Sequence, residues 1–257
     1  MRHDFGHHAV MNMIRALILT LPLVLLGFSN AAMAGDGVRP RAVVELYTSE
    51  GCSSCPPADA ALYTVNQDRR DLLVLSYHVD YWNYLGWTDP FSSAMFTDRQ
   101  HAYAQHMRER YVYTPQIIIN GHHVVKSPDQ QTIKVASNQT TSLQDIVDLS
   151  LAPRDKSHPA HGTIKLRTLS PQQNANGLKL WLVGFDDERA RDVRSGENAG
   201  RRLVHANVVR EMIDLGTWNG TADQRSFTMT SPCDGGVAVL VQDGSGGPII
   251  AASMVQF

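Results

Sequence analysis

The feature that most constrains the fold is a pair of cysteines placed between a strand pattern and a helix pattern. Residues 43–47 form a short β-rich run, and residues 56–68 are typical of a helix with prolines in its first turn, where a missing N–H group costs little. Cys52 and Cys55 lie between these segments, and a nearly continuous apolar run follows at residues 72–77. The order predicts a parallel β-α-β unit whose helix begins beside the cysteine pair.

The alternation of strand and helix patterns continues to about residue 152. Residues 91–110 are rich in helix formers and predict one or two helices, within an insertion over about residues 86–112. Asn120-Gly121 follows an apolar run at residues 117–119 and predicts a hairpin turn. Residues 142–145 resemble a capping box, so a helix is expected after them.

A polar segment at residues 153–162, with prolines and a glycine, predicts a linker. Beyond it the patterns are those of strands alone, alternating with period two and separated by glycine-rich turns. We therefore expect an α/β domain over residues 40–152, followed by a small all-β, sandwich-like domain over residues 162–257. In the second domain, residues 196–202 predict a polar loop or, alternatively, a contact with the first domain or with a partner.

The first residues have the pattern of an export signal. A short apolar run at residues 16–28 follows Arg15, and the small-x-small sequence Ala32-Met33-Ala34 comes next. The run is shorter than the about 20 residues that span a bilayer. The pattern predicts a signal peptide over residues 1–34, cleaved after Ala34, and a periplasmic or secreted bacterial protein with no stable membrane insertion after cleavage. The alternative is an uncleaved anchor.

Composition limits the possible partners and the role of the cysteines. The chain has 23 basic and 25 acidic residues, a balance without the basic footprint of a nucleic-acid-binding protein. Three cysteines are too few for a disulfide-dense scaffold, so a local or reactive disulfide is expected. Cys233 is expected to be a semi-buried small apolar residue.

The spacing of Cys52 and Cys55 brings both sulfurs within reach of one disulfide. Unpaired backbone N–H groups and the positive end of the helix dipole favour the thiolate of Cys52, so we expect its pKa to fall below about 8.5. The thiolate is the attacking species in disulfide exchange. We therefore expect Cys52 to be exposed and reactive, and Cys55 to be a more buried resolving thiol.

Other side chains are candidates for the same site. Glu45, on the strand before the cysteines, is a candidate proton shuttle for Cys55; alternatively it faces solvent at a strand end. A polar and aromatic group follows the second strand, where open α/β folds bind ligands, and is expected to line a substrate groove or else to pack an aromatic cluster. The group consists of His78, Asp80, Tyr81 and Trp82.

A second motif completes a resemblance. Thr114-Pro115 leads directly into the strand at residues 117–119. In this arrangement the chain resembles the thioredoxin-like superfamily, whose members place a cis proline before this strand, facing the cysteine pair. The resemblance implies that Pro115 is that cis proline and that the backbone of Thr114 pairs with substrate. A trans proline at the first residue of a strand is the alternative.

Longer segments resemble one secreted bacterial family, domain of unknown function 1223, between Val44 and about Glu211. These segments are VELYTSEGCSSCPPAD, HVDYWNYLGWTDPF, YTPQIIING and GENAGRRLVHANVVRE. The resemblance implies export and a thioredoxin-like core. The expected fold is therefore an α/β thioredoxin-like domain followed by a small all-β, sandwich-like domain.

Three functions are compatible with these observations. The leading hypothesis is an exported thiol–disulfide oxidoreductase that needs no dissociable cofactor and has protein thiols or disulfides as substrates, together with a separate redox partner. The second is a metallochaperone-like module that holds copper or zinc through Cys52 and Cys55, with His78 as a further ligand. The third is a non-catalytic interaction protein in which the disulfide is a structural element.

Overall fold

The N-terminal β-α-β unit has the predicted form. In this computed structural model, β2 (Ala42–Thr48) is followed by α1 (Pro56–Asp68) and β3 (Leu72–His78), and β2 pairs with β3 in parallel. All residues of both strands are buried, which explains their continuous apolar pattern. The structure describes residues 33–154, 157–170 and 177–257. Residues 1–32, which hold most of the predicted signal peptide, lie outside this range, and no described helix is long and apolar enough to cross a membrane.

The predicted insertion and hairpin follow in order. A 3-10 turn, η1 (Asn83–Leu85), precedes α2 (Ala94–Met107), and then β4 (Gln116–Ile119) pairs with β5 (His123–Val125) in an antiparallel hairpin. The predicted turn is present.

The turn residues explain why this pair occurs here. Asn120 and Gly121 have φ angles of 47° and 70°, so both lie in the left-handed region that asparagine and glycine tolerate best.

Two expectations for residues 130–162 were wrong. The third helix, α3 (Gln130–Gln139), precedes Ser142, and Asp129 caps it by accepting a hydrogen bond from Thr132 N–H at 2.9 Å. Residues after Ser142 form β6 (Val147–Arg154), whose first residues alternate between buried and half-buried, so packing on a sheet decided their conformation. The segment expected to be a linker contains the end of β6 and the start of β7 (His161–Leu166).

The strands form two sheets. The larger sheet has eight strands in the order β12-β11-β8-β9-β3-β2-β4-β5, and the smaller has the order β1-β6-β7-β10. The remaining strands are β1 (Met33–Asp36), β8 (Leu178–Asp192), β9 (Arg202–Trp218), β10 (Asp223–Thr228), β11 (Gly236–Asp243) and β12 (Ile249–Gln256).

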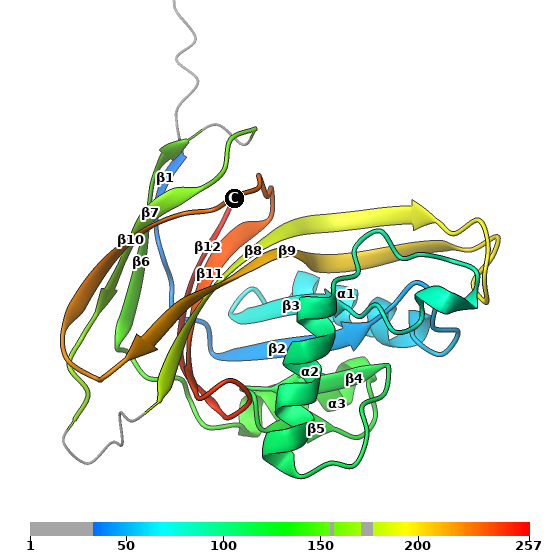
Figure 1. Cartoon of the computed structure of the whole chain (residues 1–257), viewed down its shortest axis with the longest axis horizontal. Coiled ribbons are helices and arrows are strands. Elements are labelled where there is room, and N and C mark those ends of the chain that lie inside the picture. Colours follow the sequence, from blue (N-terminus) through cyan, green and yellow to red (C-terminus); the bar gives the residue numbers. More distant parts are fainter. Residues whose placement is uncertain (1–32, 155–156, 171–176) are drawn as a thin grey trace, which may run out of the picture. The chain divides into compact units, whose positions relative to one another are not determined.

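The larger sheet crosses the boundary expected between two domains. β9 pairs with β3 in parallel through Ser76 and Val208, so strands from both predicted domains belong to one sheet, and the described residues form one compact unit. The smaller sheet takes β1 and most of β6 from before the expected domain boundary and packs through a shared apolar core on β8, β11 and β12. Sandwich-like packing is therefore present at one end, without a separate domain (Figure 1).

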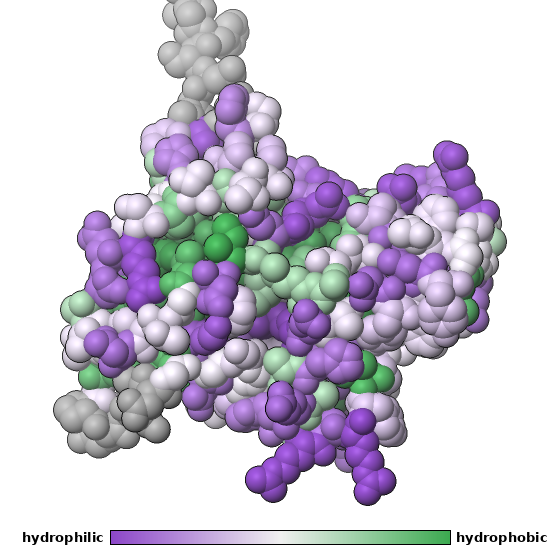
Figure 2. Space-filling view, viewed as in Figure 1, coloured by the Kyte–Doolittle hydropathy of each residue, from purple (hydrophilic) through white to green (hydrophobic). Residues whose placement is uncertain are grey.

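Helices cover both faces of the β2–β5 part of the larger sheet. Val44 and Leu46 of β2 pack in one core with residues of α1 and α3, whereas Val43 and Tyr47 pack in another with residues of α2. Figure 2 shows apolar side chains gathered in a hollow on one face of the molecule and strongly hydrophilic ones projecting beside α2.

Candidate functional site

The two cysteines form a disulfide at the start of α1. Cys52 and Cys55 are joined, with their Cα atoms 5.4 Å apart. Cys55 is the N-cap residue of α1, and its carbonyl accepts hydrogen bonds from the backbone N–H groups of Ala58 and Asp59 at 2.9 and 3.1 Å. Cys52 precedes the helix, and its own N–H group donates to Ser49 at 3.1 Å. The cysteine pair therefore occupies the predicted place between β2 and α1.

The expected exposure of Cys52 was wrong. The exposed fraction is 2% for Cys52 and 0% for Cys55. Ser54 Oγ lies 3.4 Å from Cys52 Sγ, and Gly51 lies against Trp82, close enough that a Cβ atom on Gly51 would come within 3.1 Å of Trp82 Cβ. The pair is thus covered by its own loop and by the segment after β3.

A third cover comes from the connection between β8 and β9, residues 193–201, which we call the tip segment. The Asn198 side-chain amide is fully buried and donates hydrogen bonds of 2.9 Å to the carbonyls of both Glu50 and Cys52. Ser195 Oγ donates to the Gly86 carbonyl at 2.6 Å. Of the two expectations for this segment, the contact with the cysteine region is observed.

The Thr114–Pro115 peptide bond is cis, as expected. Ser54 Oγ donates to the Thr114 carbonyl at 3.5 Å, which places this bond beside the cysteine loop. Trp82 Nε1 donates to Thr114 Oγ1 at 2.7 Å, so Trp82 connects the segment after β3 with the proline loop. The structure therefore brings together the disulfide loop, Thr114, Pro115 and Trp82.

The other three candidate groove residues, His78, Asp80 and Tyr81, form hydrogen bonds with residues outside the disulfide loop. His78 is fully buried, and its Nδ1 atom is 2.6 Å from Asp89 Oδ2, so the expectation that it lines an open groove was wrong. Asp80 accepts a hydrogen bond from Thr97 at 2.6 Å. Tyr81 donates one of 3.1 Å to Gln100 on α2, an arrangement closer to the packing alternative.

Glu45 faces the wrong side of the sheet to serve Cys55. It alternates with Leu46 along β2 and therefore shares a face with Tyr47, under α2. Its carboxylate oxygens lie 2.8 Å from Arg99 Nε and 2.5 Å from Tyr103 Oη, both on α2. Because α1 covers the opposite face, the proton-shuttle role expected for Glu45 is not supported by its position.

A buried acid–histidine cluster, formed by Glu50, Asp59 and His205, flanks the disulfide instead. Glu50 comes two residues before Cys52, and Asp59 comes four residues after Cys55. His205 on β9 lies between the two carboxylates, with Nε2 at 3.5 Å from Glu50 Oε1 and Nδ1 at 3.4 Å from Asp59 Oδ1. All three side chains are buried.

The charges of this cluster are set by burial and by each other. Burial disfavours the imidazolium of His205, but the carboxylates of Asp59 and Glu50 outweigh it and raise the His205 pKa to about 10. A third carboxylate, that of Asp89, lies near the cluster. Its partner His78 packs against His205, with their ring centroids 4.6 Å apart. Burial raises the Asp89 pKa, but His78 and two backbone N–H groups lower it more, to about 2.

Sequence reasoning missed this cluster for two different reasons. Asp59 is one helical turn after Cys55, so helical spacing alone could have identified it. His205 and Asn198 belong to segments distant in the chain, and no local pattern linked them to the cysteines.

No metal site is present among the residues that the structure describes. They contain no group of three or more His, Cys, Asp or Glu side chains able to hold a metal ion.

The third cysteine, Cys233, is free and buried, as expected, and burial raises its pKa to about 11.

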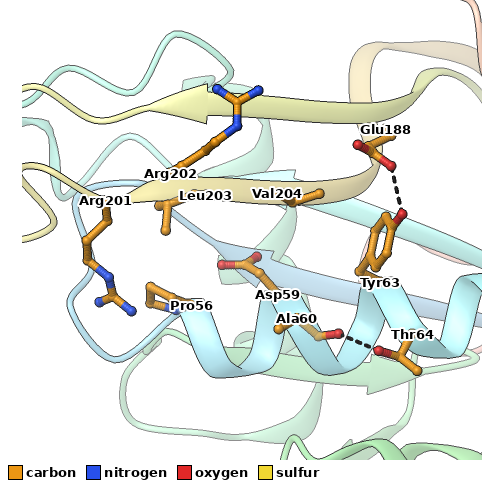
Figure 3. A pocket seen from close by; sticks show the side chains of 10 residues that line it. All are labelled: Pro56, Asp59, Ala60, Tyr63, Thr64, Glu188, Arg201, Arg202, Leu203 and Val204. Atoms are coloured by element: carbon orange, nitrogen blue, oxygen red, sulfur yellow. Dashed lines mark hydrogen bonds between the residues drawn. The ribbon is translucent and has the colours of Figure 1, made fainter.

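A groove of about 460 Å³ begins beside the disulfide and runs between α1 and β9. Figure 3 shows this α1–β9 groove, with Pro56 and Arg201 toward one end and Tyr63 and Glu188 toward the other. Its lining residues are Pro56, Asp59, Ala60, Tyr63, Thr64, Glu188, Arg201, Arg202, Leu203 and Val204.

Comparisons with known proteins identify relatives but no activity. The family described as protein of unknown function (DUF1223) matches residues 43–242. The crystal structure of protein AGR_C_4864 from Agrobacterium tumefaciens is 32% identical, with a TM-score of 0.64, over 85% of this chain and 95% of that chain. HBP35 of Porphyromonas gingivalis is similar in fold alone, with 14% identity and a TM-score of 0.58, over 85% of this chain and 76% of that chain. A comparison with curated proteins found no match.

Proposed function

This chain belongs to the DUF1223 family, and from the chemistry of its cysteine site we propose that it is an exported thiol–disulfide oxidoreductase. The observation that carries the proposal is the Cys52–Cys55 disulfide at the start of α1, beside the cis Thr114–Pro115 bond. The order of elements from β2 to α3 supports the thioredoxin-like assignment. The apolar run and small-x-small sequence before residue 35 support export to the periplasm or the medium.

The reaction is an exchange of disulfide bonds. A substrate thiolate attacks the Cys52 sulfur, forms a mixed disulfide and displaces the Cys55 sulfur with its electron pair. A second substrate thiolate then attacks the substrate sulfur of the mixed disulfide and releases Cys52. Two electrons and two protons pass from the substrate dithiol to the protein, and the reverse sequence reduces a substrate disulfide.

The displaced Cys55 sulfur needs a proton, and we assign its supply to Asp59 and His205. Asp59 follows Cys55 by one turn of α1, and His205 lies 3.4 Å from its carboxylate. Because the raised pKa keeps His205 protonated at neutral pH, the pair holds a proton inside the protein next to the helix start. This assignment replaces Glu45, which faces α2.

Access to Cys52 requires movement of its cover. With Cys52 2% exposed, a substrate sulfur reaches it after the tip segment or the Trp82 side chain has moved aside. Asn198 is the contact between the tip segment and the Cys52 carbonyl. We therefore expect slow reduction of the disulfide by small thiols, which make no other contact with the protein.

A trapping experiment tests the proposal. In Cys55→Ser, the resolving sulfur is absent, so mixed disulfides through Cys52 should accumulate on export into an oxidising compartment. The double variant Cys52→Ser/Cys55→Ser, which keeps the buried Cys233, is the control. Equal amounts of adduct in both variants would reject the proposal.

Burial of the pair favours a second candidate, a non-catalytic interaction protein in which the disulfide is structural. The midpoint potential separates the two. A potential below about −300 mV is typical of a structural disulfide, and a higher one is typical of a catalytic pair. The copper or zinc alternative gains no support from the described residues, which contain no third ligand group suited to a metal.

A further inference from the structure

We propose that the α1–β9 groove binds an extended segment of the substrate polypeptide, with an acidic side chain of that segment at Arg201 and a basic one at Glu188. This inference rests on the proposed function for the identity of the substrate, but not for the existence of the binding site. It specifies substrates whose cysteine is followed or preceded by an acidic residue, with a basic residue further away.

The position of the groove supports this proposal. Pro56, the residue after Cys55, lines one end of the groove, so a segment bound there lies beside the disulfide. The other wall is the first part of β9. Within the described chain, β9 pairs with β3 only at Val208, and the Ala206 carbonyl accepts a hydrogen bond from Ser76 of β3. Residues 202–204, which line the groove, have no paired strand on the side away from β8. An open strand edge can pair with the backbone of an extended peptide.

The charges of the groove give the bound segment a direction. At the Pro56 end, Arg201 is exposed and, among the described residues, forms no ion pair; its guanidinium donates to Asn198 Oδ1 at 2.9 Å. At the other end, the exposed Glu188 carboxylate accepts one hydrogen bond of 2.7 Å, from Tyr63. The Arg201 guanidinium, which has no ion pair among the described residues, favours a carboxylate, and the exposed Glu188 carboxylate favours a cation.

Arg201 also connects the groove to the cover over Cys52. The Asn198 side chain accepts from Arg201 through its oxygen and donates to the Cys52 carbonyl through its nitrogen. A carboxylate bound at the Nη1 group of Arg201 competes with the Asn198 oxygen for that group. A bound acidic side chain therefore acts on the contact that holds the tip segment in place.

The neighbouring arginine offers a matched control. Arg202 has the same charge and is the next residue in the chain, the first of β9, but it pairs with the exposed Asp192 at 3.1 Å. Figure 3 shows its side chain pointing away from α1. Arg202 also lines the groove, but its side chain points away from α1, so Arg201→Glu and Arg202→Glu make the same change in net charge and only the first directs a carboxylate toward the Pro56 end.

The binding test uses a fluorescently labelled, cysteine-free peptide with a glutamate near one end and a lysine near the other. We expect Arg201→Glu to weaken binding about tenfold, and Arg202→Glu to change it by less than about twofold, in low salt. Glu188→Lys should weaken the same peptide independently. In the double variant Arg201→Glu/Glu188→Lys, a peptide with the two charges exchanged should bind better than the original.

Cysteine-containing versions of the same peptides separate this proposal from the proposed function. Binding without any mixed disulfide would reject the oxidoreductase and retain the groove. For this comparison a second peptide carries glutamine in place of the glutamate. If both peptides form mixed disulfides at the same rate, and Arg201→Glu and Arg202→Glu change that rate equally, the groove is rejected and the oxidoreductase is retained. Absence of binding by the cysteine-free peptide to the wild-type protein would also reject the groove.

Discussion

At the scale of single residues, the chain buries two ionic clusters on opposite faces of its central sheet. Glu45 pairs with Arg99 under α2, whereas Asp59 pairs with His205 next to α1. Alternation along β2 separates the two, because Glu45 points to the α2 face whereas Thr48 points to the other face and donates to Asp59 at 3.2 Å. The first cluster lies on the face of β2 that α2 covers, whereas the second flanks the disulfide on the α1 side.

The Glu45–Arg99 pair should be costly to break from one side. Arg99→Leu leaves the Glu45 carboxylate buried without its cation, so the free energy of unfolding should fall by about 3–5 kcal/mol. Urea denaturation of the variant measures this loss. Glu45→Gln/Arg99→Leu removes both charges and should lose less than the single variant. A loss below about 1 kcal/mol in Arg99→Leu would contradict the assignment.

The raised pKa of His205 predicts how stability depends on pH. A group whose pKa is higher in the folded state stabilises that state fully below its unfolded pKa, here 6.5, and the contribution disappears as the pH rises through about 10. The free energy of unfolding should therefore decline across this interval in the wild type. His205→Gln should show a shallower decline, and identical slopes would be evidence against a protonated His205.

At the scale of elements, the antiparallel pair of β8 and β9 with the tip segment between them, which we call the β8–β9 arm, covers the disulfide. β9 inserts beside β3 in the larger sheet, and its preceding tip segment reaches the cysteine loop through Asn198. The β8–β9 arm was recognisable from the sequence only as strands and a polar loop.

Loss of the Asn198 contact should therefore uncover the pair. Asn198→Ala removes two hydrogen bonds to backbone carbonyls, and we expect the disulfide to be reduced by dithiothreitol about tenfold faster. Stopped-flow measurement of thiol appearance gives the rate. Arg202→Gln, in the adjoining strand β9, is the control, and its disulfide should be reduced at the wild-type rate. A wild-type rate for Asn198→Ala would show that the tip segment does not cover the disulfide.

At the scale of the whole molecule, one continuous sheet joins the two regions that the sequence separated. Ser76 of β3 donates to the Ala206 carbonyl at 2.7 Å, and Asn207 donates to the Val74 carbonyl at 2.8 Å. Both contacts are buried and link segments more than 120 residues apart, with sequence separations of 130 and 133. Neither region is complete without the other.

Cooperative unfolding should follow from this arrangement. Residues 33–257 should unfold in one transition, with coincident curves from far-ultraviolet circular dichroism and tryptophan fluorescence. A chain limited to residues 33–160 should not fold, because β3 would lose β9 and the buried carboxylates would lose His205. A dispersed NMR spectrum from that shorter chain would contradict the prediction.

The sequence alone determined the features that depend on neighbours a few residues apart. Prolines at the helix start marked α1, Asn120-Gly121 marked its turn, and the Cys52–Cys55 spacing marked the disulfide. The prediction of a helix after Ser142 was wrong, because burial of alternating residues against a sheet outweighed the local capping pattern.

Only the tertiary structure decided what surrounds the sulfur atoms. Part of the cover over Cys52 comes from Asn198, which is 146 residues away in the chain, and the charge beside Asp59 comes from His205. Such contacts form when distant strands are brought together by burial of a common core, and no local pattern encodes which residues will meet. The disulfide pair was therefore recognisable from the sequence, whereas its burial was not.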